Sequence, residues 1–215
     1  MATIRTQVRL PVRLPDGRVA TGTLVSFDGL VDGREHVALA LGDGPVPGGT
    51  GPAGVPLVRL HSECLTGDVL GSRRCDCGPQ LDDSLDLLAT MGGYLLYLRQ
   101  EGRGIGLYAK IDAYRLQDSG LDTFDANLAL GYPEDGRDYT AAAQMLQALG
   151  VEQVRLLTNN RDKTEQLNRL GIRVVEQVPM TVHVTPSNRD YLAAKASRQD
   201  GEAATLGAAT DGEHP

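Results

Sequence analysis

From residue 57 onward, short apolar segments alternate with longer segments in which apolar residues recur at helical spacing. Runs typical of strands occupy residues 57–61, 94–98, 154–157 and 172–178. Helices are expected at residues 80–90, 105–119, 138–149, 160–170 and 188–197, and a glycine ends most of them. Asp138 and Asn160 are expected to cap two of these helices. This alternation is typical of an α/β core in which helices cover a sheet.

Residues 1–42 have a different pattern, with strand-like segments at 3–14, 19–27 and 36–41. Pro15-Asp16-Gly17 is a turn signal between the first two. Residues 43–56 are rich in Gly and Pro and are expected to form a flexible surface loop, whereas residues 199–215 are small and polar and are expected to be disordered. The sequence thus predicts one mixed α/β domain over residues 1–198, with a β-rich segment (1–42), the loop, and an α/β core (57–198) around a mixed sheet.

The charge balance restricts the partners. With 21 basic and 28 acidic residues the formal net charge is −7, which argues against a general binder of nucleic acid or anionic membranes. An acidic small molecule is still possible, because a few arginines in a cleft can outweigh the net charge locally. No apolar run approaches the roughly 20 residues that a membrane span needs, and the N-terminus lacks an apolar signal segment. A cytoplasmic location is therefore expected.

All three cysteines lie within one short segment, as Cys64, Cys75 and Cys77. Three thiolates suit zinc and leave a fourth tetrahedral position for a water that can become a nucleophile near neutral pH. His61 could instead close a structural site with four ligands, and three unrelated buried thiols are a further alternative that the tight Cys75-x-Cys77 spacing disfavours. A disulfide is disfavoured by the odd number of thiols. The spacing thus favours a metal but leaves its role open.

Two segments could bind an anion. The glycine-rich segment from Arg99 to Gly106 follows a strand and opens a helix, where N–H groups and the helix dipole favour negative charge. Its G-x-G-x-G spacing is neither the dinucleotide fingerprint nor a phosphate loop, so a plain turn with solvent-facing arginines is an equal alternative. Thr158-Asn159-Asn160, with Lys163 one turn later, is either a second anion site or a simple capped helix.

Carboxylates occupy three further positions of interest. Glu63 and Glu101 follow strands, where they could accept hydrogen bonds from the N–H groups of a guanine edge or could be ordinary surface residues. Asp135-Gly136-Arg137-Asp138, read alone, is a turn with a helix cap. Together with the cysteines, these features favour a zinc hydrolase that acts on a phosphorylated small molecule.

Four strings resemble the GTP cyclohydrolase II family: Arg59-Leu-His-Ser-Glu-Cys64-Leu-Thr-Gly-Asp68, Arg74-Cys75-Asp-Cys77-Gly, Arg99-Gln-Glu-Gly-Arg103-Gly-Ile-Gly-Leu107 and Leu156-Leu-Thr-Asn-Asn160. The resemblance runs from about residue 36 to residue 195 and is loosest before residue 36 and through the Gly/Pro loop. It implies the first committed step of riboflavin synthesis, in which GTP and water yield formate, pyrophosphate and 2,5-diamino-6-(5-phosphoribosylamino)pyrimidin-4(3H)-one. It also implies a homodimer and Mg²⁺ on the triphosphate. Some family members carry a fused dihydroxybutanone-phosphate synthase domain, for which 215 residues leave no room, so the single-function form is expected.

The resemblance also implies roles for individual residues. It places zinc, with water as fourth ligand, on Cys64, Cys75 and Cys77, and so implies a catalytic rather than a structural metal. It makes Asp135 a general base, Arg137 a nucleophile, and Tyr114 a participant in ring opening. The implied GTP contacts are Arg59, Leu60, His61, Ser62, Glu63, Gln80, Glu101, Gly102, Arg103, Thr123, Thr158 and Lys163.

Three alternatives stay open at this point. A paralogue could stop at the formylated pyrimidine or merely remove pyrophosphate, and a non-catalytic GTP-binding regulator could carry a structural zinc. A zinc nucleobase deaminase is disfavoured because its H-x-E…P-C-x-x-C signature is missing. Because guanidinium is seldom deprotonated, Arg137 could act as a transition-state clamp while water attacks phosphorus.

Overall fold

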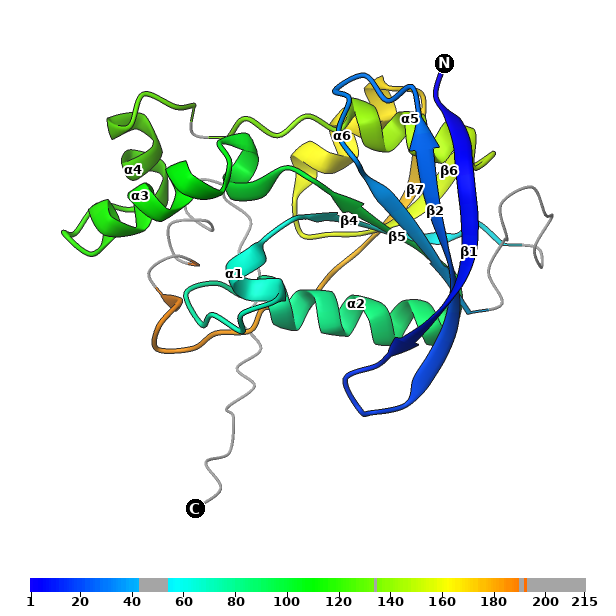
Figure 1. Ribbon diagram of the computed structural model, residues 1–215, viewed down its shortest axis with the longest axis horizontal. Coiled ribbons are helices and arrows are strands. Elements are labelled where there is room, and N and C mark those ends of the chain that lie inside the picture. The colour runs from blue at the N-terminus through cyan, green and yellow to red at the C-terminus, as the bar shows by residue number, and fades with distance from the viewer. Residues whose placement is uncertain (43–53, 134, 190–191, 193–215) are drawn as a thin grey trace.

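The computed structural model describes residues 1–42, 54–133, 135–189 and 192. Within them the strands form one seven-stranded mixed sheet in the order β1-β2-β3-β5-β4-β6-β7 (Figure 1), which confirms the predicted α/β class. The strands are β1 (Thr3–Arg13), β2 (Val19–Asp28), β3 (Val37–Leu41), β4 (Leu57–Ser62), β5 (Gly93–Leu98), β6 (Gln153–Leu157) and β7 (Arg173–Val178). The predicted strands agree with these within one or two residues at each end.

The sheet has an antiparallel half and a parallel half. Strands β1, β2, β3 and β5 pair antiparallel, whereas β5, β4, β6 and β7 pair parallel, so β5 joins the two halves. The predicted turn at Pro15-Asp16-Gly17 connects β1 to β2, with Leu14 N–H donating to the Arg18 carbonyl at 2.8 Å. Gly17 takes a φ of 86°, a conformation that glycine adopts without steric cost.

The helices are α1 (Leu65–Asp68), α2 (Cys77–Met91), the 3₁₀ turn η1 (Glu101–Gly104), α3 (Leu107–Gln117), α4 (Thr123–Ala129), α5 (Thr140–Ala148) and α6 (Arg161–Arg169). Sequence periodicity did not predict α1, η1 or α4, which are too short to show it. Helix α3 begins at Leu107, two residues later than predicted, because Gly106 has a φ of 92°.

The two predicted helix caps have different outcomes. Asn160 caps α6 as predicted, since its side chain accepts a hydrogen bond from Asp162 N–H at 2.9 Å. The prediction for α5 was wrong by one residue: Tyr139 is the N-cap, and the Asp138 carboxylate accepts from Thr140 N–H at 2.7 Å.

Three other predictions lie partly or wholly outside the described residues. In the helix predicted at 188–197, Leu192 N–H donates to the Asn188 carbonyl at 2.9 Å, and most of the remainder is not described. Residues 43–53 of the Gly/Pro loop and the tail at 199–215 also lie outside the described part.

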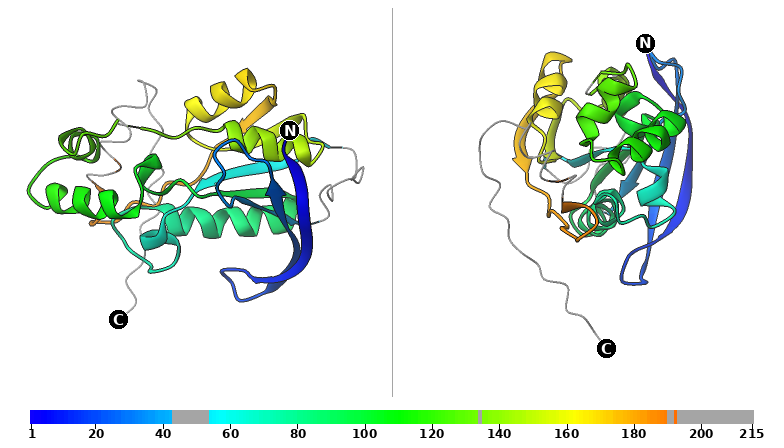
Figure 2. Two further views of the ribbon diagram at one scale, coloured as in Figure 1. Left: turned by 45° about the horizontal axis from the view of Figure 1, so that its top comes forward. Right: turned by 90° about the vertical axis from the view of Figure 1, so that its left-hand side faces the viewer.

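Apolar side chains pack against both faces of the sheet. On one face Val58, Leu60 and Leu96 pack with Met145 and Leu167, which belong to α5 and α6. On the other face a second cluster joins the sheet to α2; it contains Leu39, Leu41, Leu57, Leu88 and Leu95. Figures 1 and 2 show α2 along one side of the sheet and α5 and α6 along the other.

The alternation of side chains along β4 sets the position of the site. Because successive side chains point to opposite faces, Arg59 and His61 share the face of Leu57, which α2 covers. Helices α1 and α3 lie at one end of the sheet (Figure 1). Two buried polar side chains of β4 are thus directed toward the segments that carry the cysteines.

Candidate active site

A cavity lies beyond the carboxyl ends of the parallel strands β4, β5 and β6, the edge where open α/β sheets bind ligands. Most of the site residues assigned by resemblance line it: Arg59, His61, Ser62, Glu63, Cys64, Cys75, Cys77, Gln80, Glu101, Gly102, Arg103, Tyr114, Arg137, Thr158 and Lys163. Segments more than 90 residues apart in the chain therefore contribute to one site.

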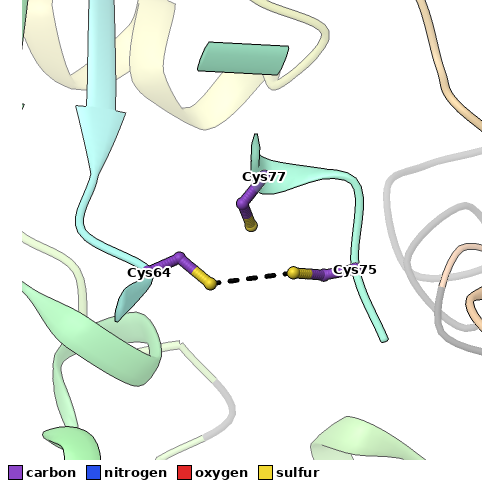
Figure 3. Close-up of side chains that lie close together, drawn as sticks. All are labelled: Cys64, Cys75 and Cys77. Carbon is purple, nitrogen blue, oxygen red and sulfur yellow. Dashed lines mark hydrogen bonds between the residues drawn. The ribbon is translucent and has the colours of Figure 1, made fainter. Parts of the chain in front are cut away.

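The three cysteines line this cavity, and their sulfurs point toward one another (Figure 3). Cys64 precedes α1, and Cys75 and Cys77 lie at the start of α2. The Cys64 and Cys75 sulfurs are 3.6 Å apart, and all three sulfurs lie within 4.8 Å of one another. Tetrahedral Zn–S bonds of about 2.3 Å separate two sulfurs by about 3.8 Å. The donor set and its spacing therefore fit a zinc ion.

His61 does not join the sulfur cluster. Among the described residues, no His, Asp or Glu atom completes the group of three sulfurs as a fourth ligand. The Nε2 atom of His61 instead lies 3.0 and 3.1 Å from the two Asp68 carboxylate oxygens. Burial lowers the pKa of His61. The alternative in which His61 closes a structural site is therefore not supported.

The three cysteine thiols differ in pKa. Hydrogen bonds with Cys75 and Cys77, together with Lys110, lower the pKa of Cys64. The same contact with Cys64 raises the pKa of Cys75 to about 11, and that of Cys77 is raised by its contacts with the other two sulfurs and by burial. A dication bound here would stabilise three adjacent thiolates, so metal binding would be coupled to thiol deprotonation.

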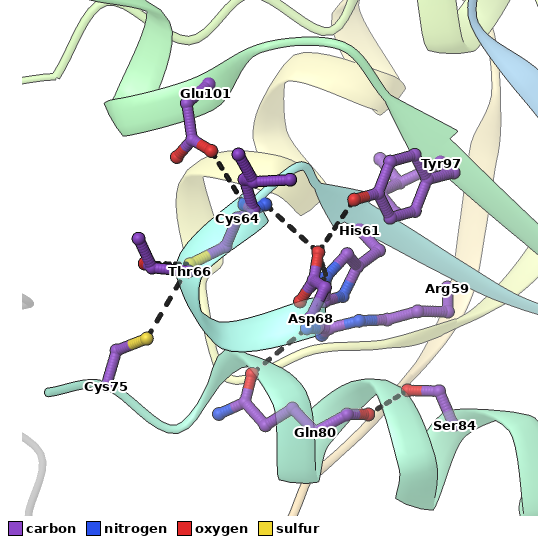
Figure 4. A network of polar contacts seen from close by, with 12 residues as sticks. Arg59, His61, Cys64, Thr66, Asp68, Cys75, Gln80, Ser84, Tyr97 and Glu101 are labelled. Atoms are coloured by element: carbon purple, nitrogen blue, oxygen red, sulfur yellow. Dashed lines mark hydrogen bonds and ion pairs between the residues drawn. The ribbon is translucent and has the colours of Figure 1, made fainter. Parts of the chain in front are cut away.

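Asp68 fixes the backbone on which Cys64 lies (Figure 4). Its carboxylate accepts from Cys64 N–H at 3.0 Å and from the Tyr97 hydroxyl at 2.8 Å, in addition to the contact with His61. The His61 and Tyr97 rings are stacked, with centroids 5.5 Å apart. Cys64 is thus held by a buried network that reaches back into β4 and β5.

Glu101 is buried in the site and is not a surface residue. Its carboxylate accepts from Leu65 N–H at 2.7 Å, from Gly102 N–H at 2.9 Å and from the Lys110 ammonium at 2.8 Å. Burial alone would lower the pKa of Lys110, but its contacts with Glu101 and Cys64 outweigh burial and raise it. Lys110 is therefore an ammonium ion inside the site.

Tyr114 lies close to the cysteines, with its hydroxyl 3.2 Å from the Thr66 hydroxyl. The guanidinium of Arg74 lies 4.9 Å from the centre of the Tyr114 ring. Burial raises the pKa of Tyr114, so its phenol stays protonated near neutral pH. A protonated phenol at this point can donate a proton to a reacting atom.

Several cations line the cavity. Arg59 is buried and donates to the Leu157 carbonyl at 3.2 Å and to Gln80 Oε1 at 3.0 Å, and burial lowers its pKa to about 10. Lys163 donates to the Leu60 carbonyl at 2.8 Å. Buried cations near an open cavity favour an anionic ligand such as phosphate.

Asp135 and Arg137 form an ion pair in the turn before α5. Arg137 Nε donates to Asp135 Oδ1 at 2.9 Å. Burial would raise the pKa of Asp135, but Arg137 outweighs it and lowers the pKa. Gly136 N–H donates to the Arg103 carbonyl at 3.0 Å, so the turn docks on η1, where Arg103 has an unusual φ of 59°.

A few assigned residues do not line the cavity. The Leu60 side chain is fully buried in the core on the other face, although its carbonyl contacts Lys163. Asp135 does not line the cavity but pairs with Arg137, which does. Thr123 begins α4, and its side chain lies outside the described part. Arg99, considered above as a phosphate donor, pairs with Glu63 at 2.9 Å and is half-exposed outside the cavity.

Several lining residues were not predicted from the sequence. They include Arg74, Asp76, Lys110, Gln117, Asn127 and Met180. Lys110 had one usable signal, because it precedes Tyr114 by four residues and thus lies on the same face of the predicted helix. Asp76 lies between two predicted metal ligands. The others have no comparable signal in their local sequence.

Comparison with known proteins tests the family assignment. The family model for GTP cyclohydrolase II matches residues 6–179. The chain belongs to the GTP cyclohydrolase II family. The resemblance in the sequence motifs is thereby confirmed, although the match begins about 30 residues earlier than expected and ends at residue 179.

Individual relatives agree with the family. The GTP cyclohydrolase-2 of Vibrio vulnificus is 53% identical over 174 residues, which are 81% of this chain and 85% of that protein. The GTP cyclohydrolase-2 of Hahella chejuensis is 55% identical over 166 residues, or 77% of each chain. The riboflavin biosynthesis protein RibBA of Mycobacteroides abscessus is 49% identical over 200 residues, which are 90% of this chain but 48% of that protein. The chain is thus an enzyme of the GTP cyclohydrolase II family.

One finding bears on membranes. None of the helices in the described residues combines the length and the apolar character that a bilayer crossing requires.

Proposed function

We propose that the protein hydrolyses GTP to formate, pyrophosphate and 2,5-diamino-6-(5-phosphoribosylamino)pyrimidin-4(3H)-one, the first step of riboflavin biosynthesis. The observation that carries the proposal is that one cavity is lined by a cluster of three sulfurs, by buried cations and by Arg137, which pairs with Asp135. A purine triphosphate needs chemistry at both ends, at the imidazole carbon and at the α-phosphate.

Cys64, Cys75 and Cys77 would hold zinc, because their sulfurs are grouped and no fourth side-chain ligand joins them in the described residues. When bound, zinc supplies a Lewis acid that activates water for attack at neutral pH. Tyr114 is placed to donate its proton to the ring nitrogen or oxygen as the imidazole ring opens.

Recognition of the guanine falls to polar groups at or after the ends of β4 and β5 and to one side chain of α2. Ser62, Glu63, Gln80 and the backbone at Gly102 line the cavity and offer both donors and acceptors. The Glu101 carboxylate already accepts three hydrogen bonds, so we assign it to holding the loop around the base.

The triphosphate, carried with Mg²⁺, is expected against Arg59, Arg103, Thr158 and Lys163. In the Asp135–Arg137 pair, Asp135 stays ionised, and guanidinium is seldom deprotonated. We therefore favour Arg137 as a clamp on the α-phosphate with water as the attacker. Direct attack by Arg137, with Asp135 taking its proton, is the second possibility, and trapping a phosphorus–nitrogen adduct would identify it.

Incubation of the purified protein with GTP and Mg²⁺, followed by chromatography of all products, tests the proposal. Formate, pyrophosphate and the diaminopyrimidine in equal amounts are expected. A formylated pyrimidine as the final product would instead identify the truncated reaction, and GTP binding without turnover would identify the regulator. A Cys77→Ser variant is the matched control and should bind less metal and release no formate.

We further propose a homodimer, one catalytic domain over residues 1–198 and a cytoplasmic enzyme, following the family. Light scattering at several protein concentrations tests the homodimer. Limited proteolysis tests the domain bounds, since cleavage should be confined to residues 43–56 and to the region after residue 198. Fractionation of the source cells tests the location.

A further inference from the structure

Lys110 of helix α3 lies beside the cysteine cluster with its side chain only 11% exposed. Its ammonium is 3.1 Å from the Cys64 sulfur, 3.0 Å from the Thr66 hydroxyl and 2.8 Å from Glu101 Oε1. An ammonium group has three N–H donors, so these three acceptors use all of them. The geometry fixes the Lys110 side chain at a point where it contacts both a proposed metal ligand and the loop over the site.

The contact with Cys64 has an electronic consequence. A hydrogen bond from a cation withdraws electron density from the sulfur and weakens its donation to a bound metal. Three thiolates around Zn²⁺ give a site with one excess negative charge, and Lys110 is the cation that the structure places against that sulfur. Outer-shell partners of this kind tune the acidity and the affinity of a metal site.

The contact with Thr66 has a geometric consequence. The Thr66 hydroxyl oxygen accepts from Lys110 and lies 3.2 Å from the Tyr114 hydroxyl and 3.6 Å from the Cys64 sulfur. A hydroxyl has one proton and two lone pairs, so occupying one lone pair restricts how it can pair with the phenol. Lys110 thus orients Thr66, and Thr66 orients Tyr114.

We propose that Lys110 is a positioning residue that sets both the electron donation of the Cys64 sulfur and, through Thr66, the orientation of the Tyr114 phenol. This inference rests on the proposed function, because it assumes a metal on the cysteines and a reacting role for Tyr114. The competing view is that Lys110 is only a structural partner of Glu101.

Cobalt substitution separates the two views. In Co²⁺-loaded protein, thiolate-to-metal charge transfer gives an absorption band whose energy depends on the hydrogen bonds to sulfur. For Lys110→Met we expect one metal per chain, a band moved to longer wavelength, and a kcat that falls by about 10- to 100-fold with little change in KM. Lys110→Arg keeps the charge and the donors and should restore the band. Arg115→Met removes an exposed cation from the same helix and should change neither the absorption band nor kcat.

The outcomes are distinct. A Lys110→Met protein with the wild-type band and wild-type kcat would overturn the inference. If Lys110→Met fails to fold by circular dichroism, Thr66→Val takes its place: it should lower kcat, and an unchanged kcat would refute the relay to Tyr114. If wild-type protein shows the thiolate band but does not hydrolyse GTP, the proposed function fails, while the band shift still decides the role of Lys110 at the metal.

Discussion

Replacing Gly104 with alanine would add a methyl group where two segments of the active site touch. The added Cβ would lie 2.9 Å from the Gly136 carbonyl oxygen and 3.1 Å from its carbon, both rigid backbone atoms. Gly136 separates Asp135 from Arg137, so the clash acts directly on the turn that carries the proposed phosphate chemistry. Gly104 also has a φ of 94°, which disfavours any side chain.

The magnitude has two parts. A left-handed conformation costs a residue with a Cβ about 1–2 kcal/mol, which lowers the melting temperature of a domain of this size by about 2–8 °C. The turn must also move by about 0.5 Å to restore ordinary contact. Because a 1 Å misplacement can cost about 100-fold in rate, a shift of half that size predicts a loss of about 10-fold in kcat.

Gly106→Ala is the matched control. Gly106 has nearly the same φ, 92°, but nothing lies within 4 Å of its added Cβ. Both variants should therefore lose stability to the positive φ, and Gly104→Ala somewhat more because of the clash, whereas pyrophosphate release should fall about tenfold only in Gly104→Ala. Equal loss of turnover in the two variants, or full activity in Gly104→Ala, would refute the reasoning that docking of the turn on η1 positions Arg137.

Three further results are expected. Asp68→Asn should lower the free energy of unfolding in urea by about 1–3 kcal/mol, because the buried carboxylate that accepts from Cys64 N–H and Tyr97 is weakened as an acceptor. Arg137 holds the pKa of Asp135 below its usual value of about 3.9, so the pair stabilises the folded state fully above that pH and loses its effect as pH falls below it. Wild type and Asp135→Asn should therefore differ in melting temperature equally at pH 7 and pH 5 and converge below about pH 4. Treatment with a chelator should remove one metal per chain and abolish formate release, and added zinc should restore it; full activity in metal-free protein would exclude the metal role.

The sequence predicted those elements whose local signals agree with the fold. Apolar runs such as the one at β4 predicted each strand, and Asn160 predicted the start of α6. The three cysteines predicted one cluster because every thiol lies within a single short segment. Strand order could not be predicted in the same way. The antiparallel pairing of β3 with β5 joins the two halves of the sheet and depends on contacts more than 50 residues apart.

The missed parts of the site depend on distant contacts. Helix α1 has four residues, and Asp68 at its end is held by Tyr97 and His61 from two strands. The 3₁₀ turn contains Arg103 in a left-handed conformation that no local preference would predict. Lys110 contacts Cys64 across 46 residues of sequence. The helical spacing of Lys110 and Tyr114 predicts only that they share a face, so the contacts themselves are identified by the three-dimensional structure.

The segment Glu101–Gly106 contacts both the cysteine-bearing segment and the Asp135–Arg137 turn, which suggests how the two chemical steps share one site. Glu101 accepts from Leu65 N–H, next to the first cysteine. The Arg103 carbonyl accepts from Gly136 N–H, between the proposed phosphate-reacting residues. Perturbing the two contacts should therefore change different products: Lys110→Met should slow formate release more than pyrophosphate release, and Gly104→Ala should do the reverse. If both variants slow the two releases in the same proportion, the loop acts as one rigid support and the steps are not separable through it.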